Sequence, residues 1–311
     1  MTKTKRLRQN DSKKRLMSMK KIAIIGANGQ LGQYLLSSLS ALECESVQCK
    51  LIGLNREMLD LNKTEKIQTI LSEICPDILI NASAYTAVDK AESEPELAHR
   101  INCLAPAEIA AFAFSAKIPL IHYSTDYVFA GDANAPYLES DRTAPQGEYG
   151  ASKLAGEEEV LGSGAQAYIF RTAWVYSQKG SNFYKTMLNL AQNRTELNVV
   201  QDQIGSPTYA ASIAKATSQI VSKLISGEQF SSGVYHMTCQ GQTNWAEFAK
   251  TIFELNNVAM TVCGIPSSEY PTPAKRPNYS VLNNQKLLDV FGVSLPSWQD
   301  SLNDCVKEKK G

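Results

Sequence analysis

The sequence predicts a doubly wound α/β fold built on a parallel sheet, and three features point to it. Short, continuous apolar runs that suit buried strands alternate with longer amphipathic runs that suit helices. A cluster of glycines follows the first apolar run directly. Polar side chains gather after later apolar runs, at the sheet edge where open α/β folds hold ligands. A smaller C-terminal lobe is expected to cover that edge.

The predicted elements alternate from residue 21 onward. The strands are expected at residues 21–26, 50–54, 77–81, 119–124 and 167–171. The intervening helices are expected at residues 29–42, 64–74, 94–116 and 148–158. After residue 171 the pattern loosens into two helical runs, SNFYKTMLNLAQN and AASIAKATSQIVSKL, and Pro-rich loops. This change in pattern marks the start of the smaller lobe.

Residues 1–19 are predicted to be a disordered basic tail. The first 21 residues hold nine lysines and arginines against one acid, Asp11, although the whole chain balances 31 basic with 31 acidic residues. The tail has no apolar periodicity with which to pack on a core. We expect residues 1–18 to be dispensable for folding, with Met19 as a candidate functional start.

Composition restricts the class of protein. A chain that is 43% hydrophobic and 20% charged is typical of a soluble globular protein, and it shows neither a secretory signal nor a membrane span. Its seven scattered cysteines form no C-x-x-C pair, which favours a reducing cytoplasm over a disulfide framework. The three histidines lie far apart, so no protein-built metal site is predicted. We expect a cytoplasmic protein with neither nucleic-acid nor membrane partners.

The glycine cluster predicts a dinucleotide site. Gly26, Gly29 and Gly32 follow the first strand and open a helix. Glycines allow a tight turn and close approach of a pyrophosphate, which a helix N-terminus favours electrostatically. A chance cluster at a strand-to-helix turn is the alternative. The loop residues assigned to the cofactor are Gly26, Asn28, Gly29, Gln30 and Leu31.

The end of the second strand favours NADPH, with NADH as the alternative. The acidic residue that would bind the ribose hydroxyls of NAD is absent, and Asn55 and Arg56 stand there instead. An arginine at this place accommodates the 2′-phosphate of NADP. Asp60 and Leu61 are assigned to the adenine, although Asp60 capping the next helix explains that residue equally well. The cofactor site is completed by residues after the third strand, Ala82 and Ala84.

A second pair of motifs carries chemistry. Tyr149 and Lys153 stand four residues apart on a predicted helix and therefore share a face. Small residues around them let another backbone or a flat ligand approach closely: Gly150, Ala151, Ala155 and Gly156. The fourth strand delivers polar side chains to the carboxyl edge of the sheet: Ser124, Thr125, Asp126 and Tyr127. A tyrosine and a lysine at this spacing also occur by chance on solvated helices.

Thr125, Tyr149 and Lys153 together resemble the hydroxyl, tyrosine and lysine constellation of the extended short-chain dehydrogenase/reductase superfamily. Within it, the chain is similar to the dTDP-4-dehydrorhamnose reductase family over residues 20–300. The similarity lies in the ordered blocks NASAYTAVDKAESEPELAHRIN, HYSTDYVFAG, YGASKLAGE, FRTAWVYSQKGSNFYKTML, DQIGSPT and YPTPAKRPNYSVLN. Such blocks are more specific than a glycine loop or Y-x-x-x-K alone.

The resemblance implies a reaction and a domain plan. It implies NAD(P)H-dependent reduction of the C4 keto group of dTDP-4-dehydro-L-rhamnose, the last step of dTDP-L-rhamnose synthesis. Residues 20–171 would form an NAD(P)-binding Rossmann domain. Residues 172–311 would form mainly a substrate-binding lobe, with some segments returning to the first domain. The acidic run DKAESEPE is interpreted as a solvated helix start.

The resemblance also implies residue roles. Tyr149 would donate a proton to the substrate oxygen, and Lys153 would lower the pKa of the phenol and bind the nicotinamide ribose. Thr125 would hydrogen-bond the substrate carbonyl or the phenol. The nucleotide sugar is assigned to Thr86, Val88, Ser124, Thr125, Tyr127, Trp174, Asn182 and Arg276. Two of these have alternatives: Trp174 as a core aromatic and Arg276 as a solvated loop charge.

Neighbouring functions are only partly excluded. Nucleotide-sugar 4,6-dehydratases carry Asp-Glu after the catalytic hydroxyl, whereas this chain has Asp126-Tyr127. A 4-epimerase uses the same tyrosine and lysine but retains its cofactor. The chain also resembles the regulatory subunit of methionine adenosyltransferase, a binding protein. Some reductases of the family form Mg²⁺-bridged dimers and others are monomers; the sequence leaves this open, together with the choice of dTDP or UDP and the exact sugar.

Overall fold

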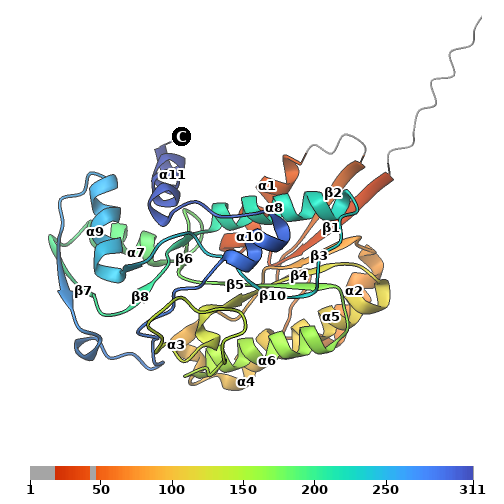
Figure 1. Ribbon diagram of the computed structural model, residues 1–311, viewed down its shortest axis with the longest axis horizontal. Coiled ribbons are helices and arrows are strands. Elements are labelled where there is room, and N and C mark those ends of the chain that lie inside the picture. Colours follow the sequence, from red (N-terminus) through yellow and green to blue (C-terminus); the bar gives the residue numbers. More distant parts are fainter. Residues whose placement is uncertain (1–17, 43–46, 311) are drawn as a thin grey trace, which may run out of the picture.

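A computed structural model describes residues 18–42 and 47–310, and its centre is a parallel sheet of six strands (Figure 1). The strands lie in the order β10-β5-β4-β3-β1-β2, and every neighbouring pair is parallel. Their bounds are β1 Ser18–Ile25, β2 Val47–Leu54, β3 Ile78–Asn81, β4 Leu120–Thr125, β5 Ala167–Thr172 and β10 Gly233–His236. The predicted doubly wound α/β class is confirmed.

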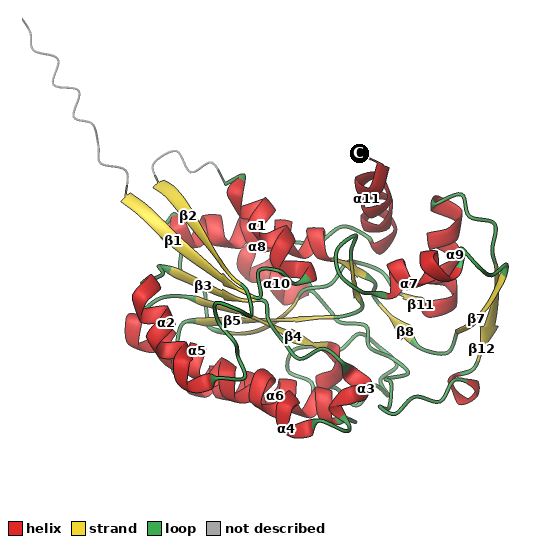
Figure 2. Ribbon diagram, turned by 180° about the vertical axis from the view of Figure 1, so that it is seen from behind, coloured by secondary structure: helices red, strands yellow, loops and turns green. Residues whose placement is uncertain are grey.

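Helices cover both faces of this sheet (Figure 2). Because strand side chains alternate, Ile22 and Ile24 enter one core cluster while Ala23 and Ile25 enter the other. On the first face lie α1 Gln30–Ser40, α8 Ala210–Ile225 and α10 Gln285–Phe291. On the opposite face lie α2 Ile67–Ile74, α5 Ala105–Ala116 and α6 Glu148–Gly162.

Two helices begin differently from the prediction. The helix expected at 64–74 starts with a 3₁₀ turn, Thr64–Lys66, before α2. The helix expected at 94–116 consists of α4 Pro95–His99, a π-helical turn Arg100–Leu104, and α5. Shorter helical segments are α3 Val88–Ala91 and the 3₁₀ turns Asp126–Val128 and Ser267–Glu269.

The N-terminal boundary needs a correction of two residues. The tail was predicted to reach residue 19, but β1 begins at Ser18, which pairs with Val47 of β2. Met19 pairs with Gln48 in the same register. Residues 1–17 of the predicted tail lie outside the described residues.

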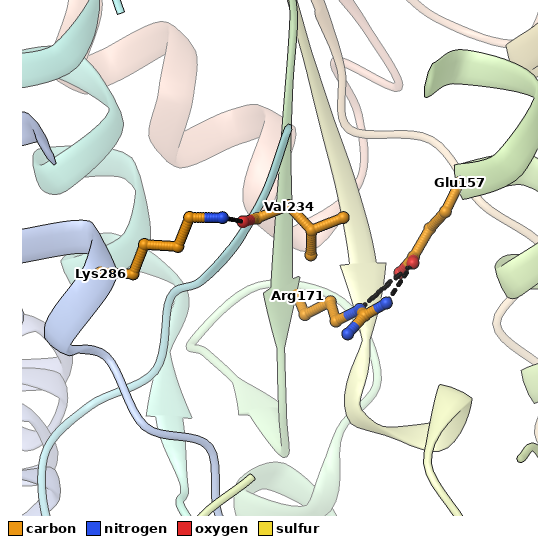
Figure 3. Close-up of polar contacts among 4 residues, drawn as sticks. All are labelled: Glu157, Arg171, Val234 and Lys286. Atoms are coloured by element: carbon orange, nitrogen blue, oxygen red, sulfur yellow. Dashed lines mark hydrogen bonds and ion pairs between the residues drawn. The ribbon is translucent and has the colours of Figure 1, made fainter. Parts of the chain in front are cut away.

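The chain beyond residue 172 divides between the sheet and a smaller group of elements. β10 extends the sheet next to β5, and the Lys286 ammonium donates to the carbonyl of Val234 on this edge strand at 2.8 Å (Figure 3). The remaining elements gather at one end of the molecule (Figure 1). They are β6 Val175–Tyr176, α7 Phe183–Leu190, β7 Glu196–Val200, β8 Ile204–Gly205, β9 Thr208–Tyr209, β11 Thr243–Asn244, α9 Trp245–Leu255, β12 Thr261–Ile265 and α11 Trp298–Lys310. Among the helices of residues 18–42 and 47–310, none is long and apolar enough to cross a membrane.

The small residues of α6 allow close packing against neighbouring backbone. A Cβ at Gly156 would lie 2.0 Å from the carbonyl oxygen of Asn102, in the π-helical turn. A Cβ at Gly150 would lie 2.3 Å from the carbonyl oxygen of Tyr127. Both approaches are closer than any side chain permits. The interpretation of these glycines as sites of backbone approach is therefore confirmed.

Gly156→Ala is expected to lower the free energy of unfolding by about 1–3 kcal/mol, because the added methyl group forces α6 away from Asn102. Gly162→Ala is the matched control on the same helix, since nothing lies within 4 Å of its Cβ position. That substitution should be neutral or stabilise by up to about 1 kcal/mol. Urea denaturation of both variants measures the contrast, and equal stability of the two would contradict it.

Candidate active site

A cavity of about 810 Å³ lies along the carboxyl ends of the parallel strands. It brings together every residue assigned to a site from the sequence except Arg276. These are Gly26, Asn28, Gly29, Gln30, Leu31, Asn55, Arg56, Asp60, Leu61, Ala82, Ala84, Thr86, Val88, Ser124, Thr125, Tyr127, Tyr149, Lys153, Trp174 and Asn182. Their shared location follows from the parallel sheet, although each individual role stays a prediction.

The glycine turn after β1 has a backbone that only glycine fits well. Gly26 has φ +81°, and a Cβ there would lie 2.9 Å from the backbone nitrogen of Ser83. A Cβ at Gly32 would lie 2.1 Å from the carbonyl oxygen of Gly26. Helix α1 begins directly after Gly29 and has no side-chain cap. Its first N–H groups therefore have no side-chain partner, and its first residues, Gln30 and Leu31, line the cavity, which suits an anionic ligand there.

Arg56 and Asp60 form the rim next to the glycine turn. The Arg56 side chain is 79% exposed, and its Nε lies 3.6 Å from Oδ1 of Asp60. The same Asp60 oxygen accepts the backbone N–H of Asn62 at 3.1 Å. Because α2 begins only at Ile67 and has no side-chain cap, the interpretation of Asp60 as its cap is wrong. The contact between Asp60 and adenine stays a prediction.

Lys153 is a buried residue of the cavity lining. It is 2% exposed, and its Nζ donates to the carbonyl oxygen of Tyr123 at 2.6 Å. Burial lowers the pKa of Lys153 to about 8, against the opposing influence of the Glu157 carboxylate. Desolvation disfavours the charged form of an amine in this way. The lysine can therefore lose its proton near neutral pH.

Tyr149 stands one helical turn before Lys153 on α6 and lines the same cavity. Burial raises the pKa of the Tyr149 phenol, while its hydrogen bond with Thr125 lowers that pKa. Its ring also packs edge-to-face on that of Tyr127, with the centroids 5.4 Å apart. The phenol is thus held neutral, in the form that can donate a proton.

Asp126 is a buried neighbour that the sequence reasoning used only to exclude dehydratases. The Thr125 hydroxyl donates to its Oδ1 at 2.9 Å, and the Thr125 oxygen accepts the N–H of Tyr127 at 3.2 Å. Asp126 is 2% exposed, and burial raises the pKa of its carboxyl group to about 6. Thr125 therefore presents its oxygen as an acceptor for as long as Asp126 is ionised.

Trp174 forms one wall of the cavity in a restrained position. Its φ is +49°, and its ring stacks on Trp245 with centroids 3.5 Å apart and an interplanar angle of 7°. A Cβ at Gly205 would lie 2.4 Å from the Trp174 ring, so close packing there needs a glycine. Trp245 was missed, because nothing in the local sequence links it to Trp174.

Asn182 and Gln30 both line the cavity and are hydrogen-bonded to each other. Nδ2 of Asn182 donates to Oε1 of Gln30 at 2.8 Å and to the carbonyl oxygen of Ser177 at 2.9 Å. Its Oδ1 accepts the N–H of Lys185 and thereby caps α7. Both predicted ligand-binding side chains therefore connect the glycine turn to the loop before α7. A direct contact of Asn182 with a diphosphate stays a prediction.

Arg276 lies outside the cavity lining, in contact with a residue of it. Its Nη2 donates to Oδ2 of Asp89 at 2.7 Å, and its Nη1 donates to the Tyr127 hydroxyl at 3.2 Å. The interpretation as a solvated loop charge is therefore wrong, because the guanidinium is paired and its side chain is 22% exposed. Its contact with the diphosphate stays a prediction.

The acidic run DKAESEPE also has more partners than predicted. Asp89 binds Arg276, Oε1 of Glu92 accepts the N–H of Glu148 at 2.9 Å, and Oε2 of Glu94 accepts the Tyr85 hydroxyl at 2.5 Å. Glu92 thus supplies an acceptor at the first turn of α6, near Tyr149. Most of the run is exposed at the starts of α3 and α4, as predicted, and Asp89, Glu92 and Glu94 have specific partners in addition.

A buried ion pair fixes α6 against β5 (Figure 3). Nη2 and Nε of Arg171 donate to the two carboxylate oxygens of Glu157 at 2.6 and 2.9 Å. The side chains are 4% and 1% exposed. This bidentate geometry orients the helix that carries Tyr149 and Lys153. In the part of the chain that the structure describes, no cluster of three or more His, Cys, Asp or Glu side chains could hold a metal ion.

Comparison with known proteins gives the family. The model of the RmlD substrate binding domain family matches residues 19–310. A dTDP-4-dehydrorhamnose reductase of Burkholderia thailandensis is 41% identical over 299 residues, which cover 93% of this chain and 98% of the relative. The chain belongs to the dTDP-4-dehydrorhamnose reductase family. The resemblance expected from the ordered sequence blocks is thereby confirmed.

Solved structures of the family have the same fold. The dTDP-4-dehydrorhamnose reductase of Clostridium acetobutylicum superimposes with a TM-score of 0.86 at 36% identity, covering 94% of this chain and 100% of that chain. The enzyme of Bacillus anthracis, solved in complex with NADP, gives a TM-score of 0.84 at 37% identity, with coverage of 93% and 99%. The family resemblance thus extends over the whole described fold.

Glu157→Gln is expected to lower the free energy of unfolding by about 3–5 kcal/mol, because it leaves the buried Arg171 guanidinium without its counter-charge. Glu247→Gln is the control, since it breaks an exposed pair with Lys250 that is worth less than about 1 kcal/mol. Chemical denaturation measures both changes. A loss below 1 kcal/mol for Glu157→Gln would contradict the anchoring role of the pair.

Proposed function

We propose that this protein uses NAD(P)H to reduce the C4 keto group of dTDP-4-dehydro-L-rhamnose and so forms dTDP-L-rhamnose. The observation that carries the proposal is the meeting of Thr125, Tyr149 and Lys153 with a glycine turn in a single cavity. Full-length relatives that share these elements are named for this activity. The nucleotide and the sugar follow from those names, since residue chemistry alone does not select them.

The residues at the glycine turn fit a nicotinamide dinucleotide. Gly26 and Gly32 leave no space for a Cβ, and the uncapped start of α1 offers N–H donors to a pyrophosphate. The exposed Arg56 guanidinium suits the 2′-phosphate of NADPH. When bound, the reduced nicotinamide supplies the hydride. The Bacillus anthracis relative was solved with NADP.

The chain's own residues supply the proton. Tyr149, held neutral by burial, donates its phenolic proton to the oxygen of the C4 keto group as that oxygen gains negative charge. The Lys153 ammonium then stabilises the phenolate and restores its proton, which a lysine with a pKa of about 8 can do near neutrality. Thr125 holds the phenol in line through their hydrogen bond.

The sugar side of the cavity orients the substrate. Thr86, Val88, Tyr127 and Trp174 all line the cavity and are assigned to the sugar. The Tyr127 hydroxyl accepts a hydrogen bond from Arg276, which is assigned to the diphosphate. A 4,6-dehydratase is disfavoured because Tyr127 stands where a second carboxylate would be needed. The choice between a monomer and an Mg²⁺-bridged dimer, which the sequence leaves open, stays open.

Turnover of dTDP-4-dehydro-L-rhamnose tests the proposal directly. Purified protein with NADPH should consume the reduced cofactor in a stoichiometric amount, because a reductase exchanges its cofactor. Isomerised sugar without net oxidation of NADPH would instead support an epimerase. Binding of NADPH without any reaction would support a regulatory subunit.

Tyr149→Phe is expected to lower kcat by roughly 10²-fold or more while leaving NADPH affinity nearly unchanged, because it removes only the proton donor. Lys153→Met should lower both kcat and the affinity for NADPH, since the ammonium is assigned to the nicotinamide ribose as well as to the phenol. Tyr270→Phe, at an exposed tyrosine, is the control and should change neither. Calorimetric titration with NADPH beside the reductase assay separates the two effects. Wild-type turnover in Tyr149→Phe would refute the donor assignment.

Arg56→Ala is expected to lower kcat/KM for NADPH by about 10-fold while changing the value for NADH little. A charge-assisted hydrogen bond to the 2′-phosphate contributes on the order of 1–3 kcal/mol. Arg142→Ala, at an exposed arginine outside the cavity lining, is the matched control. If the ratio of kcat/KM for NADPH to kcat/KM for NADH is unchanged in Arg56→Ala, another group distinguishes the two cofactors.

A further inference from the structure

The orientation of a buried amide is fixed behind the catalytic lysine. Asn81 ends β3, is 1% exposed, and its Oδ1 accepts the backbone N–H of Ser83 at 3.1 Å. A backbone N–H can only donate, so the amide oxygen must face Ser83. The amide NH₂ therefore faces the other neighbour, Nδ1 of His122, at 3.1 Å.

This amide selects the tautomer of His122. Asn81 and His122 are register partners on the neighbouring parallel strands β3 and β4, and the imidazole is fully buried. Because Nδ1 accepts a hydrogen from Asn81, the neutral ring carries its own hydrogen on Nε2. Burial, together with the nearby Lys153 charge, holds the pKa of His122 well below its ordinary value. The ring thus stays neutral.

The Nε2–H of His122 faces the catalytic lysine. Nε2 lies 3.4 Å from Nζ of Lys153. An ammonium group has donors only and offers nothing to this N–H, whereas a neutral amine has a lone pair that can accept it. The other partner of Nζ, the carbonyl oxygen of Tyr123 at 2.6 Å, can accept from either form. His122 therefore distinguishes between the two protonation states of Lys153.

We propose that His122 is a positioning residue whose Nε2–H stabilises the amine form of Lys153, so that the lysine gives up its proton readily during each reduction. The inference rests on the proposed function. Tyr149 passes its proton to the C4 oxygen, and the resulting phenolate takes a proton from the Lys153 ammonium. The new lone pair of Lys153 accepts Nε2–H, and the amine is then recharged by a proton from water. His122 keeps its own proton throughout.

The other charges around Lys153 do not replace this effect. Glu157, on the same helix, favours the ammonium, but its carboxylate is held in the bidentate pair with Arg171 of β5. Tyr149 is the other titratable group of α6 at the cavity, and Asp126 in the turn after β4 acts on the pKa of Tyr149. Of His122, Glu157, Tyr149 and Asp126, it is His122 that places an N–H donor next to Nζ of Lys153.

The tautomer can be read in the wild-type protein by NMR with ¹⁵N-labelled histidine. The chain has only three histidines, and the exposed His99 is assigned with His99→Gln. His122 should show an unprotonated Nδ1 and a protonated Nε2 across neutral pH. Asn81→Asp should reverse this, since one carboxylate oxygen accepts from Ser83 and the other accepts Nδ1–H. The His122 signals are those that His122→Phe removes, which separates them from His236, whose Nδ1 faces the carbonyl oxygen of Asn283 at 3.2 Å. A protonated Nδ1 on His122 in wild type, or an imidazolium there, would overturn the inference whether or not the protein is a reductase.

The pH dependence of kcat tests the effect on Lys153. His122→Phe removes the donor, so the alkaline limb assigned to Lys153 should move up by roughly half a unit to one unit. Asn81→Asp makes Nε2 an acceptor and should move the limb in the same direction, which covers the case that His122→Phe does not fold. His99→Gln is the control and should leave the limb in place. If these variants have a lower kcat but an unchanged alkaline limb, the role of His122 is purely structural and the inference is overturned.

Discussion

The hydrogen bond from the buried ammonium of Lys153 to the carbonyl oxygen of Tyr123 is the contact on which the arrangement of the site depends. It requires a lysine on α6 to reach the carboxyl-terminal half of strand β4 through the protein interior. That reach is possible only if the helix lies very close to its neighbours. Gly150 and Gly156 provide the closeness, because neither position has room for a Cβ. The ion pair between Glu157 and Arg171 then fixes the helix along the sheet.

The same burial determines the chemistry. Burial raises the pKa of Tyr149 and lowers that of Lys153 to about 8, which brings the lysine toward neutral pH. Glu157 could have kept the lysine strongly charged, but Arg171 engages both of its oxygens. His122 adds a donor that matches the neutral amine. The burial of Lys153, the pKa shifts of Tyr149 and Lys153, and the proposed proton transfer therefore all depend on the close packing of α6 against the sheet.

Sequence reasoning predicted what depends on local pattern. The glycine turn, the tyrosine and lysine on one helical face, and the polar end of β4 follow from spacings of a few residues, and parallel strands bring such sites to one edge. Contacts between distant segments were missed or assigned differently. Asn182 and Gln30 are 152 residues apart in sequence, and Arg276 and Asp89 are 187 apart. The stacking of Trp245 on Trp174 and the fixed amide of Asn81 likewise depend on tertiary packing. The hydrophobic periodicity of the sequence does not predict such contacts.

Transfer of deuterium from the cofactor tests the central claim most directly, because it identifies both the reaction and the atom that reacts. The protein would be incubated with dTDP-4-dehydro-L-rhamnose and NADPH carrying deuterium stereospecifically at C4 of the nicotinamide. The account predicts dTDP-L-rhamnose with one deuterium at C4 of the sugar, from one face of the nicotinamide only. Deuterium at any other carbon, or a sugar product without deuterium from either labelled cofactor, would contradict it.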